Sequence, residues 1–559
     1  MQVSSPDARC RLVFLGGVGE VGRNMAAVEL DGRLLIVDVG LSFPSADMPG
    51  IDLVLPDFEW LRGRADAIDA IVLTHGHEDH VGALPYLLRD LDRRMPVLGT
   101  AFTLELLKGK LDEHQVVDLV EGRVVEPGGG DVTVGAFTLR FLHVTHSIPD
   151  GAAIAIDTPH GTILHTGDFK IDQTPIDNDP TDLHGLAEEA GRGVHLLLSD
   201  STNAEEPGHT TSERTVGPVI ERIVRDAPEI VVVACFSRHI HRVQQVVDAA
   251  LANRRVVAFL GRSMQNSVAA ARRLGILKVD DRDVVDISEV DRLDPGNVVV
   301  ICTGSQGEPF SALSLMAARE HKWVKLKEHD TVVLSSSLIP GNEPAIHRVV
   351  DALYRSGADV YHVPSDPVHA SGHAAQEELR LMLSLVRPRW FIPVHGERRH
   401  LQHHARLAEE VGIPRDRILI CEDGDLVEVG DQVRVVDRVP AGMTFVDGLG
   451  IGDVGGEVLR DRRKLAGDGV VVVVLTVDGR TGELVGNPEI LNRGFVHEGT
   501  SGEIIETARE RVKLALEESA GAEVIDPTMI QQNVRRVLKR YFLDVTQRKP
   551  VILPVVMEV

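Results

Sequence analysis

The chain has 559 residues and is 43% hydrophobic, so we expect a globular protein of two to four domains rather than a single core. Its net charge of −25 excludes a protein that coats nucleic acid through general basic charge, although an enzyme with a local basic groove is still allowed. The sequence has no run of 18 apolar residues, so we expect no membrane span and no membrane partner. Residues 1–7 lack the basic start and apolar core of a secretory signal.

The four cysteines lie far apart, at positions 10, 235, 302 and 421. This spacing argues against a disulfide framework and against a zinc site built from thiolates. It is typical of a protein in a reducing compartment, and we therefore expect a cytoplasmic location.

Polar side chains follow four strand-like apolar runs in the first 210 residues. The runs and the residues that follow them are 34–37 with Asp38, 141–144 with His146, 162–165 with Asp168, and 196–198 with Asp200. A single Asp after a strand is usually a turn or helix-cap residue, but four such endings argue against coincidence. Because α/β proteins build their sites in the loops beyond strand ends, we expect these side chains to share one site.

The most informative segment is HGHEDH, residues 75–80, between an apolar run at 70–73 and a helix-like run that begins at Val81. His and Asp are ligands for zinc and manganese, and a turn between strand and helix can hold them rigidly yet exposed. The alternate residues His75 and His77 can point at one ion, while Asp79 and His80 turn toward a second. A His-rich surface loop is the alternative, and it does not account for this spacing.

Residues 213–365 change to an alternation of strands and helices. Apolar runs lie at 230–234, 255–260, 298–301 and 331–334, with helices expected near 240–253 and 264–274. This alternation predicts a parallel sheet with helices packed on it. Each run is followed by a Gly- or Ser-rich loop, and the amides and hydroxyls of such loops suit phosphate groups.

Two more histidine groups lie in residues 366–400. Residues 368–373 read VHASGH, and the apolar run 391–394 ends at His395, with a helix expected between them at 375–385. An isolated histidine is more often a structural imidazole, but the grouping and the strand-end position favour a functional site.

The tail from about residue 467 is expected to form a separate α+β domain. It shows an apolar strand at 470–475, a helix face at 504–515, a helix that begins at Asp526-Pro527, and a final strand at 550–559. Because it carries no catalytic grouping, we interpret it as an assembly or RNA-contact module with its own core. Residues 451–466, which include a basic run, are expected to be a linker.

These motifs resemble the metallo-β-lactamase signature, and the insertion with the later HASGHA and PVHGE segments resembles the β-CASP nucleases. Longer strings, from GGVGEVGRN near the start to LPVVMEV at the end, are similar to the bacterial ribonuclease J family. The resemblance implies an α/β chain with a four-layer αββα metallo-β-lactamase domain that is split by an insertion. The implied parts are 1–212 and 366–450 for that domain, 213–365 for a β-CASP domain, 451–466 for the linker and 467–559 for a small α+β C-terminal domain.

The resemblance implies two divalent metal ions per subunit, zinc, manganese or both. The implied ligands are His75, His77 and His146 for one ion, Asp79, His80 and His395 for the other, and Asp168 as a bridge between them. Asp38 and Asp200 would not bind the ions themselves but would orient the side chains that do. Asp447 would be the acidic ligand of a structural calcium ion.

The resemblance also implies a metal-dependent phosphodiesterase. Asp79 and Asp168 would act with the ions to activate water, and His373 would protonate the departing 3′ oxygen, which leaves a 5′ phosphate on the product. The residues expected to contact substrate are His369, Ala370, Ser371, Gly372 and His373 of the VHASGH segment, and Ser237, Arg238 and His239 of the insertion. Arg238 and His239 stand at a position that varies among relatives, and Ser371 would line a pocket for a 5′ phosphate.

The function implied is 5′→3′ exonuclease action on RNA with a 5′ monophosphate, together with endonuclease activity, in RNA maturation and mRNA decay. The expected partners are single-stranded RNA, further copies of the chain in a homodimer or homotetramer, and members of an RNA-degradation complex. Aromatic residues are only 4% of the chain, so phosphate contacts should dominate over stacking. This predicts weak sequence preference and strong salt dependence.

Three alternatives remain. A hydrolase of thioesters or lactones would share HGHEDH but would lack the insertion and the later histidine groups. A DNA-directed β-CASP nuclease would share every local motif, and only substrate competition would separate the two. A non-enzymatic RNA scaffold would have lost its ligands, whereas every expected ligand is present in this sequence.

Overall fold

The computed structural model describes residues 9–45, 47–338, 342–479, 481, 483–497, 502–517 and 527–559. It divides into two units, one of residues 1–43 and 54–444 and the other of residues 44–53 and 445–559. The N-terminal segment 1–7, residues 339–341 and the expected helix cap at Asp526 lie outside the described residues. None of the described helices is long and apolar enough to cross a membrane.

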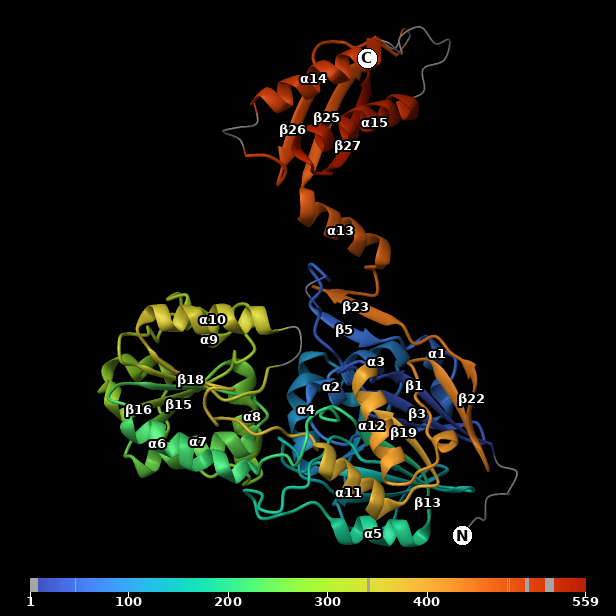
Figure 1. Cartoon of the computed structure of the whole chain (residues 1–559), viewed down its shortest axis with the longest axis vertical. Coiled ribbons are helices and arrows are strands. Elements are labelled where there is room, and N and C mark those ends of the chain that lie inside the picture. Colours follow the sequence, from blue (N-terminus) through green and yellow to red (C-terminus); the bar gives the residue numbers. More distant parts are fainter. Residues whose placement is uncertain are drawn as a thin grey trace. The chain divides into compact units, whose positions relative to one another are not determined.

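Two sheets form the centre of the first unit (Figure 1). The eight-stranded sheet has the order β22-β21-β1-β3-β4-β6-β7-β8, and the six-stranded sheet has the order β19-β13-β12-β11-β10-β9. The strands of the first sheet are β1 (Cys10–Gly16), β3 (Met25–Leu30), β4 (Arg33–Val37), β6 (Ile68–Val72), β7 (Met95–Gly99), β8 (Val120–Val124), β21 (Asp425–Val429) and β22 (Val433–Arg438). Those of the second are β9 (Val132–Val134), β10 (Phe137–His143), β11 (Ala152–Thr158), β12 (Gly161–His165), β13 (Val194–Asp200) and β19 (Trp390–Val394).

The main core lies between these two sheets, where alternate side chains of both face each other. Leu12, Val28, Phe141 and Ile154 belong to one continuous buried cluster. Outer helices complete the layers, and their bounds are α1 (Glu59–Arg62), α2 (Glu78–Val81), α3 (Leu84–Leu91), α4 (Ala101–Glu113), α5 (Leu183–Arg192), α11 (Gln376–Val386) and α12 (Arg398–Glu410). Helices α5, α11 and α12 pack on the second sheet, and α4 contacts β7 and β8 of the first.

Residues on both sides of the insertion build this double-sheet body. Strand β19 pairs in parallel with β13, and β21 pairs in antiparallel fashion with β1. The segment that returns after the insertion therefore completes both sheets, and it brings His395 to the end of β19, at one edge of the six-stranded sheet.

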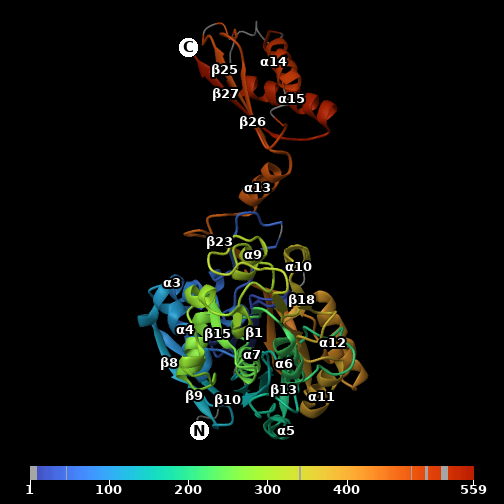
Figure 2. The ribbon, with the colours of Figure 1, turned by 90° about the vertical axis from the view of Figure 1, so that its left-hand side faces the viewer.

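The insertion is a parallel sheet with helices on both faces (Figures 1 and 2). Its strand order is β15-β16-β14-β17-β18, and every pair is parallel, as the alternation in the sequence predicts. The strands are β14 (Val231–Ala234), β15 (Val256–Leu260), β16 (Val298–Cys302), β17 (Thr331–Leu334) and β18 (Asp359–His362). Helices α6 (Val216–Asp226), α7 (Ile240–Ala252) and α8 (Arg262–Arg273) cover one face, and α9 (Ala312–Ala317) and α10 (Glu343–Ser356) cover the other.

The insertion is seated on the double-sheet body through a shared core. Phe102 of α4 and Ile148 belong to the same buried cluster as the side chains beneath α6, α7 and α8. An ion pair joins Arg273 of α8 to Glu105 of α4 at 2.7 Å. Apolar packing and charge therefore both connect the two parts along α4.

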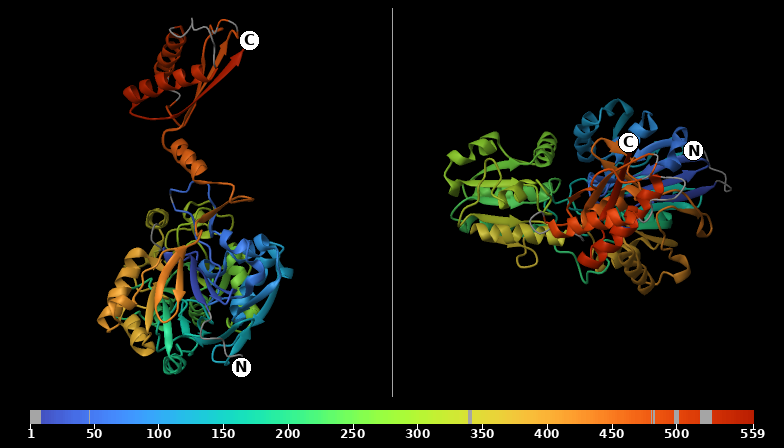
Figure 3. Two further views of the ribbon diagram at one scale, coloured as in Figure 1. Left: turned by 90° about the vertical axis from the view of Figure 1, so that its right-hand side faces the viewer. Right: turned by 90° about the horizontal axis from the view of Figure 1, so that it is seen from above.

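The second unit holds the C-terminal α+β domain. Its sheet has the order β26-β25-β27, with β25 (Val470–Val477) central between β26 (Glu489–Arg493) and β27 (Val551–Glu558). Helices α14 (Gly502–Glu517) and α15 (Pro527–Thr546) pack on one face of this sheet, as Figure 3 shows, and they bury Val512, Val534 and Phe542. The short hairpin of β23 (Met443–Asp447) and β24 (Gly450–Ile451) belongs to this unit from Phe445 onward.

Most of the expected linker is a helix. Residues Gly456–Asp468 form α13, in which only Leu459 is buried. The segment is rich in Leu, Arg, Lys and Glu, which are strong helix formers, so it can hold a helix without a buried face of its own.

The four cysteines are unpaired and buried.

Candidate metal centre and nuclease site

The side chains expected to hold metal gather at one edge of the two sheets. They follow strand ends, with His75 and His77 after β6, His146 after β10, Asp168 after β12, Asp200 at the end of β13, and His395 after β19. Strands β4 and β6 run parallel, and so do β12, β13 and β19. Because the carboxyl ends of parallel strands meet at the same edge, residues up to 320 positions apart in the chain reach one site.

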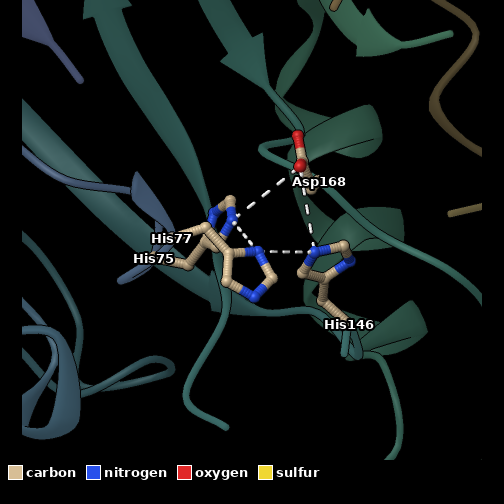
Figure 4. A group of neighbouring side chains, drawn as sticks. All are labelled: His75, His77, His146 and Asp168. Carbon is tan, nitrogen blue, oxygen red and sulfur yellow. Dashed lines mark hydrogen bonds and ion pairs between the residues drawn. The ribbon is translucent and has the colours of Figure 1, made fainter. Parts of the chain in front are cut away.

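The first group consists of His75, His77, His146 and Asp168 (Figure 4). Nδ1 of His77 lies 3.1 Å from Nε2 of His75 and 3.1 Å from Nε2 of His146. Oδ2 of Asp168 lies 3.8 Å from each of those two Nε2 atoms. Three ring nitrogens and one carboxylate oxygen therefore point toward a common centre.

A hydrogen bond on the far side of the His146 ring leaves its inward nitrogen free of a proton. Nδ1 of His146 lies 2.7 Å from the carbonyl oxygen of Gly372, to which it donates, so its Nε2 faces the group. Burial and the nearby His373 lower the pKa of His146 to about 3, and burial together with neighbouring imidazoles holds the pKa of His75 well below its ordinary value. Neutral rings with facing lone pairs are the form in which histidine binds a metal.

The second group consists of Asp79, His80, Asp168 and His395, so Asp168 belongs to both. Nδ1 of His80 is 2.8 Å from Oδ2 of Asp38, which turns its Nε2 to within 3.2 Å of Oδ2 of Asp168. Nδ1 of His395 is 3.0 Å from the Thr202 hydroxyl. Nε2 of His395 is buried, has no hydrogen-bond partner among the described residues, and lies 3.4 Å from Oδ2 of Asp79.

The buried carboxylates of this site favour a bound cation. Burial alone would raise the pKa of Asp168, but the nearby His395 and His80 hold it below its ordinary value. Conversely, burial opposes a charged His395, yet the facing carboxylates, Asp168 first among them, raise its pKa to about 10. Positive charge is thus stabilised where the ligands converge, and the mixed nitrogen and oxygen donors suit zinc or manganese. The residues therefore fit two divalent ions.

A third group adds His373 and Asp200 beside the two metal groups, together with Asp168 and His395. Nδ1 of His373 is 2.8 Å from Oδ2 of Asp200. The His373 side chain is 21% exposed, whereas Asp200 is buried. Part of the His373 side chain therefore stays accessible, while the carboxylate fixes the orientation of its ring.

Comparisons with known families and proteins cover most of the chain. Matching family models are described as "Ribonuclease J, beta-CASP domain" for residues 228–353, "Ribonuclease J C-terminal domain" for 457–559, "Zn-dependent metallo-hydrolase RNA specificity domain" for 366–417 and "Metallo-beta-lactamase superfamily" for 18–231. The chain is 46% identical to Ribonuclease J of Mycobacterium tuberculosis, with 98% of this chain and 97% of the relative covered. It is 41% identical to Ribonuclease J2 of Bacillus subtilis, with 98% of each covered.

The chain belongs to the ribonuclease J family. A solved structure of a protein of unknown function from Enterococcus faecalis shares the fold, with a TM-score of 0.54 and 16% identity over 75% of this chain and all of that chain. The expected fold class, a metallo-β-lactamase domain with a β-CASP insertion and a C-terminal domain, is confirmed. As a ribonuclease J family member, the chain is a metal-dependent, RNA-binding nuclease of the hydrolase class.

In this ribonuclease J family member, the side chains of Lys170, which is buried, and Asn203, which is half-buried, hold the VHASGH loop. Nζ of Lys170 donates to the carbonyl oxygen of Ser371 at 3.1 Å. Nδ2 of Asn203 donates to the carbonyl oxygen of His373 at 3.0 Å and to the Ser371 hydroxyl at 2.9 Å. Ala370 is buried and His369 lies beside His239, with ring centroids 6.2 Å apart.

Of the three insertion residues expected to contact substrate, Arg238 and His239 face protein groups. Arg238 bonds to the carbonyl oxygen of Gly76 and to the Glu78 carboxylate. His239 is fully buried, with its Nε2 3.2 Å from Glu213. Ser237 is half-buried. Contact of these residues with substrate stays a prediction.

Asp447, the expected calcium ligand, lies in the second unit, and its carboxylate is paired with Arg462. It belongs to none of the groups of metal-ligand side chains found among the described residues. A guanidinium bound to the carboxylate opposes a calcium ion there, so this expectation gains no support.

Four residues that support the site had no role assigned to them from the sequence: Asn24, Lys170, Thr202 and Asn203. Asn24 donates from its backbone N–H to the carbonyl oxygen of Asp79 at 2.9 Å, and its side chain lies 3.1 Å from Nε2 of His80. Asn24 ends the string GGVGEVGRN, and the other three residues follow the strand-end carboxylates Asp168 and Asp200 within three positions, so the signal lay in or beside the motifs. What they bind could not be read from spacing, because each bonds to a segment distant in sequence.

The GGVGEVGRN loop links the two halves of the metallo-β-lactamase domain. Strand β2 (Val18–Gly19) pairs with β20 (Gly396–Glu397), directly after His395. Within this loop Arg23 is paired with Glu20 at 2.6 Å and with Asp423 at 3.4 Å. Asp423 also accepts the backbone N–H of Val18 at 3.0 Å. This charge cluster, with Arg23 buried at its centre, thus fixes the backbone of the loop.

This cluster predicts a pH-dependent stability that Asp423→Asn removes. Burial and the Glu20 carboxylate raise the pKa of Asp423 to about 7, against the opposing effect of Arg23. The folded state thus binds this proton more tightly than the unfolded state, so its stabilisation is present below about pH 4 and is lost as the pH rises to about 7. From about pH 5 to 8, the free energy of unfolding of Asp423→Asn should gain ~1 kcal/mol or more relative to the unmodified chain in urea titrations. The control is Glu422→Gln, at an exposed neighbouring position, for which the difference in the free energy of unfolding from the unmodified chain should not change with pH. An equally constant difference for Asp423→Asn would contradict the assignment.

Proposed function

We propose that this chain is a two-metal ribonuclease that degrades RNA from a 5′-monophosphate end in the 5′→3′ direction and also cuts internally, in RNA maturation and mRNA decay. The observation that carries the proposal is that two groups of metal-ligand side chains share Asp168 and lie directly beside the His373–Asp200 pair. Metal ligands, a proton donor and an adjacent loop suited to phosphate are the parts that phosphodiester hydrolysis needs.

In the proposed site, His75, His77, His146 and Asp168 would hold one divalent ion, and Asp79, His80, Asp168 and His395 the other. When bound, two such ions supply a water nucleophile at neutral pH and neutralise charge on the phosphate oxygens. Asp38 keeps Nε2 of His80 pointed inward, and Thr202 and Asp200 do the same for His395 from the Nδ1 side.

His373 is the proposed proton donor to the leaving 3′ oxygen. Burial opposes its charged form, but the Asp200 carboxylate favours it, and the net effect raises the pKa of His373 above its ordinary value. With Nδ1 bonded to Asp200, Nε2 is the nitrogen that would deliver the proton.

The VHASGH loop is the proposed site for the 5′ phosphate. Its carbonyl groups at Val368, Ser371, Gly372 and His373 bond to Arg242, Lys170, His146 and Asn203 respectively. The peptide N–H groups of residues 369–372 have no protein acceptor among the described residues. Backbone amides that are left free by such an arrangement are suited to bind an anion.

The test uses one internally labelled RNA with either a 5′ monophosphate or a 5′ triphosphate, incubated with protein and zinc or manganese. Early release of mononucleotides from the monophosphate form, and slow release from the triphosphate form, is the expected result. A matched single-stranded DNA competitor should inhibit less than unlabelled RNA.

Two outcomes would contradict parts of the proposal. Internal fragments from both RNA forms, without mononucleotides, would make the chain chiefly an endonuclease. Equal competition by DNA would remove the RNA preference. The expected homodimer or homotetramer is tested separately, since the mass of the particle in solution should then be two or four times that of one chain.

A further inference from the structure

The β14–α7 turn of the insertion reaches the metal-binding loop of the other domain. Arg238, in this turn, is bonded through one guanidinium nitrogen to the carbonyl oxygen of Gly76 and through another to the carboxylate of Glu78. Its side chain is only 12% exposed. Lys110 of α4 bonds to the second oxygen of the same Glu78 carboxylate.

The residues that Arg238 contacts alternate with the proposed metal ligands. His75, His77 and Asp79 point toward the ligand groups, whereas Gly76 and Glu78 lie between them and are bonded from the opposite side. One guanidinium therefore bonds to the loop at the two residues that lie between the proposed ligands. A bidentate, charge-assisted contact of this kind restricts the backbone more than a single hydrogen bond does.

We infer that Arg238 is a positioning residue by which the β-CASP insertion holds the HGHEDH loop in its metal-binding conformation, so that metal affinity depends on the seating of the insertion. The inference rests on the proposed metal-binding role of that loop. It differs from a direct role in substrate binding, because the guanidinium is already engaged by protein groups.

The start of α7 also bonds to the VHASGH loop, the second loop of the proposed site. Arg242, one turn further along in α7, is fully buried and donates to the carbonyl oxygen of Val368 at 2.8 Å, at the head of the VHASGH loop. It also bonds to Glu213 and to the Ser335 hydroxyl. Two arginines four residues apart thus connect one insertion segment to the metal loop and to the proposed phosphate loop.

An exposed ion pair across a domain seam normally contributes little, and Arg273–Glu105 is such a pair. The Arg273 side chain is 59% exposed, and it contacts α4 rather than the metal loop. Arg273→Met is therefore the matched control for Arg238→Met, because each removes one arginine that links the insertion to the double-sheet body.

The experiment measures Mn²⁺ binding by calorimetry, and RNA binding in the presence of a chelator, for the unmodified chain, Arg238→Met, Glu78→Gln, the double variant and Arg273→Met. We expect Arg238→Met to weaken Mn²⁺ binding about 10- to 100-fold, as loss of a group that orients metal ligands typically does. The double variant should bind Mn²⁺ about as weakly as the weaker single variant, because the two residues act through one contact. Arg273→Met should change Mn²⁺ affinity by less than about twofold.

Metal-free RNA affinity separates positioning from substrate contact. Arg238→Met should leave it unchanged, whereas loss of a phosphate contact would weaken it and would lower the salt dependence by about one ion. That second result, with unchanged Mn²⁺ affinity, would overturn the inference. If the unmodified chain bound no Mn²⁺ or Zn²⁺, the proposed function would fail instead.

A folding defect in Arg238→Met does not remove the test. Arg238→Lys keeps the charge but cannot span both Gly76 and Glu78, so it should give an intermediate loss of Mn²⁺ affinity. Lys110→Met removes the other cation at Glu78 without touching the insertion, and it should weaken Mn²⁺ binding less than Arg238→Met. Full affinity in both variants would contradict the inference.

Discussion

Replacing Asp168 by alanine is expected to lower kcat/KM for RNA cleavage by about 1,000-fold or more, since it removes a ligand from both metal groups at once. Asp168 is buried and faces His75, His80, His146 and His395. No other side chain in the described part of the chain belongs to both groups. The measurement is initial-rate cleavage of 5′-monophosphate RNA, together with metal content per subunit.

The same variant should stay folded, because the core between the two sheets does not include Asp168. Asp168→Asn, which keeps the volume of the side chain, serves as a second variant if Asp168→Ala loses its thermal transition. Asp416→Ala, at an exposed position, is the matched control and should retain full activity. Full activity of Asp168→Ala with intact metal content would remove the two-metal assignment.

The sequence was sufficient to predict the strands of the site because their ends carry the chemistry. Apolar runs that end on His or Asp, such as 162–165 before Asp168, are visible in the chain without any tertiary information. The parallel sheet of the insertion followed from its alternating apolar runs in the same way. In both cases the local sequence pattern agrees with the fold, and for this reason the strands could be predicted from the sequence.

What the sequence could not give is the set of contacts between distant segments. Arg238 and Glu78 are 160 residues apart, and nothing in either motif indicates that one bonds to the other. The helix α13 was missed for a different reason, because a polar, basic segment without an apolar face reads as a connector. Its high helix propensity was the available signal.

The insertion contributes contacts that hold the loops of the proposed metal site. A metallo-β-lactamase domain supplies all seven proposed ligands, but Arg238 and Arg242 of the insertion bond to the two loops that shape the site. The shared core around Phe102 and Ile148 fixes the insertion against α4. The proposed phosphate loop, the proposed metal loop and the insertion are therefore bonded to one another, so loss of Arg238 should alter metal binding although Arg238 belongs to the insertion.

The second large effect on the cleavage rate is expected at the step in which the 3′ oxygen departs. His373→Gln should lower kcat for ordinary RNA by about 100- to 10,000-fold, because the 3′ oxygen then departs without a proton donor. An RNA in which sulfur replaces the bridging 3′ oxygen at the scissile bond needs no such proton, since a thiol has a pKa of only about 8.5. With this substrate and Mn²⁺, His373→Gln should cleave at nearly the rate of the unmodified chain.

Asp168→Ala provides the contrast that makes this test specific. A variant that disrupts the metal groups should cleave both substrates slowly, whereas a variant that lacks only the proton donor should recover on the sulfur substrate. Asp200→Asn should show the same recovery to a smaller degree, because Asp200 orients His373 through Nδ1 but also contacts His395. If His373→Gln were equally slow on both substrates, His373 would act on the metal groups, as its place in the third ligand group with Asp168, Asp200 and His395 allows.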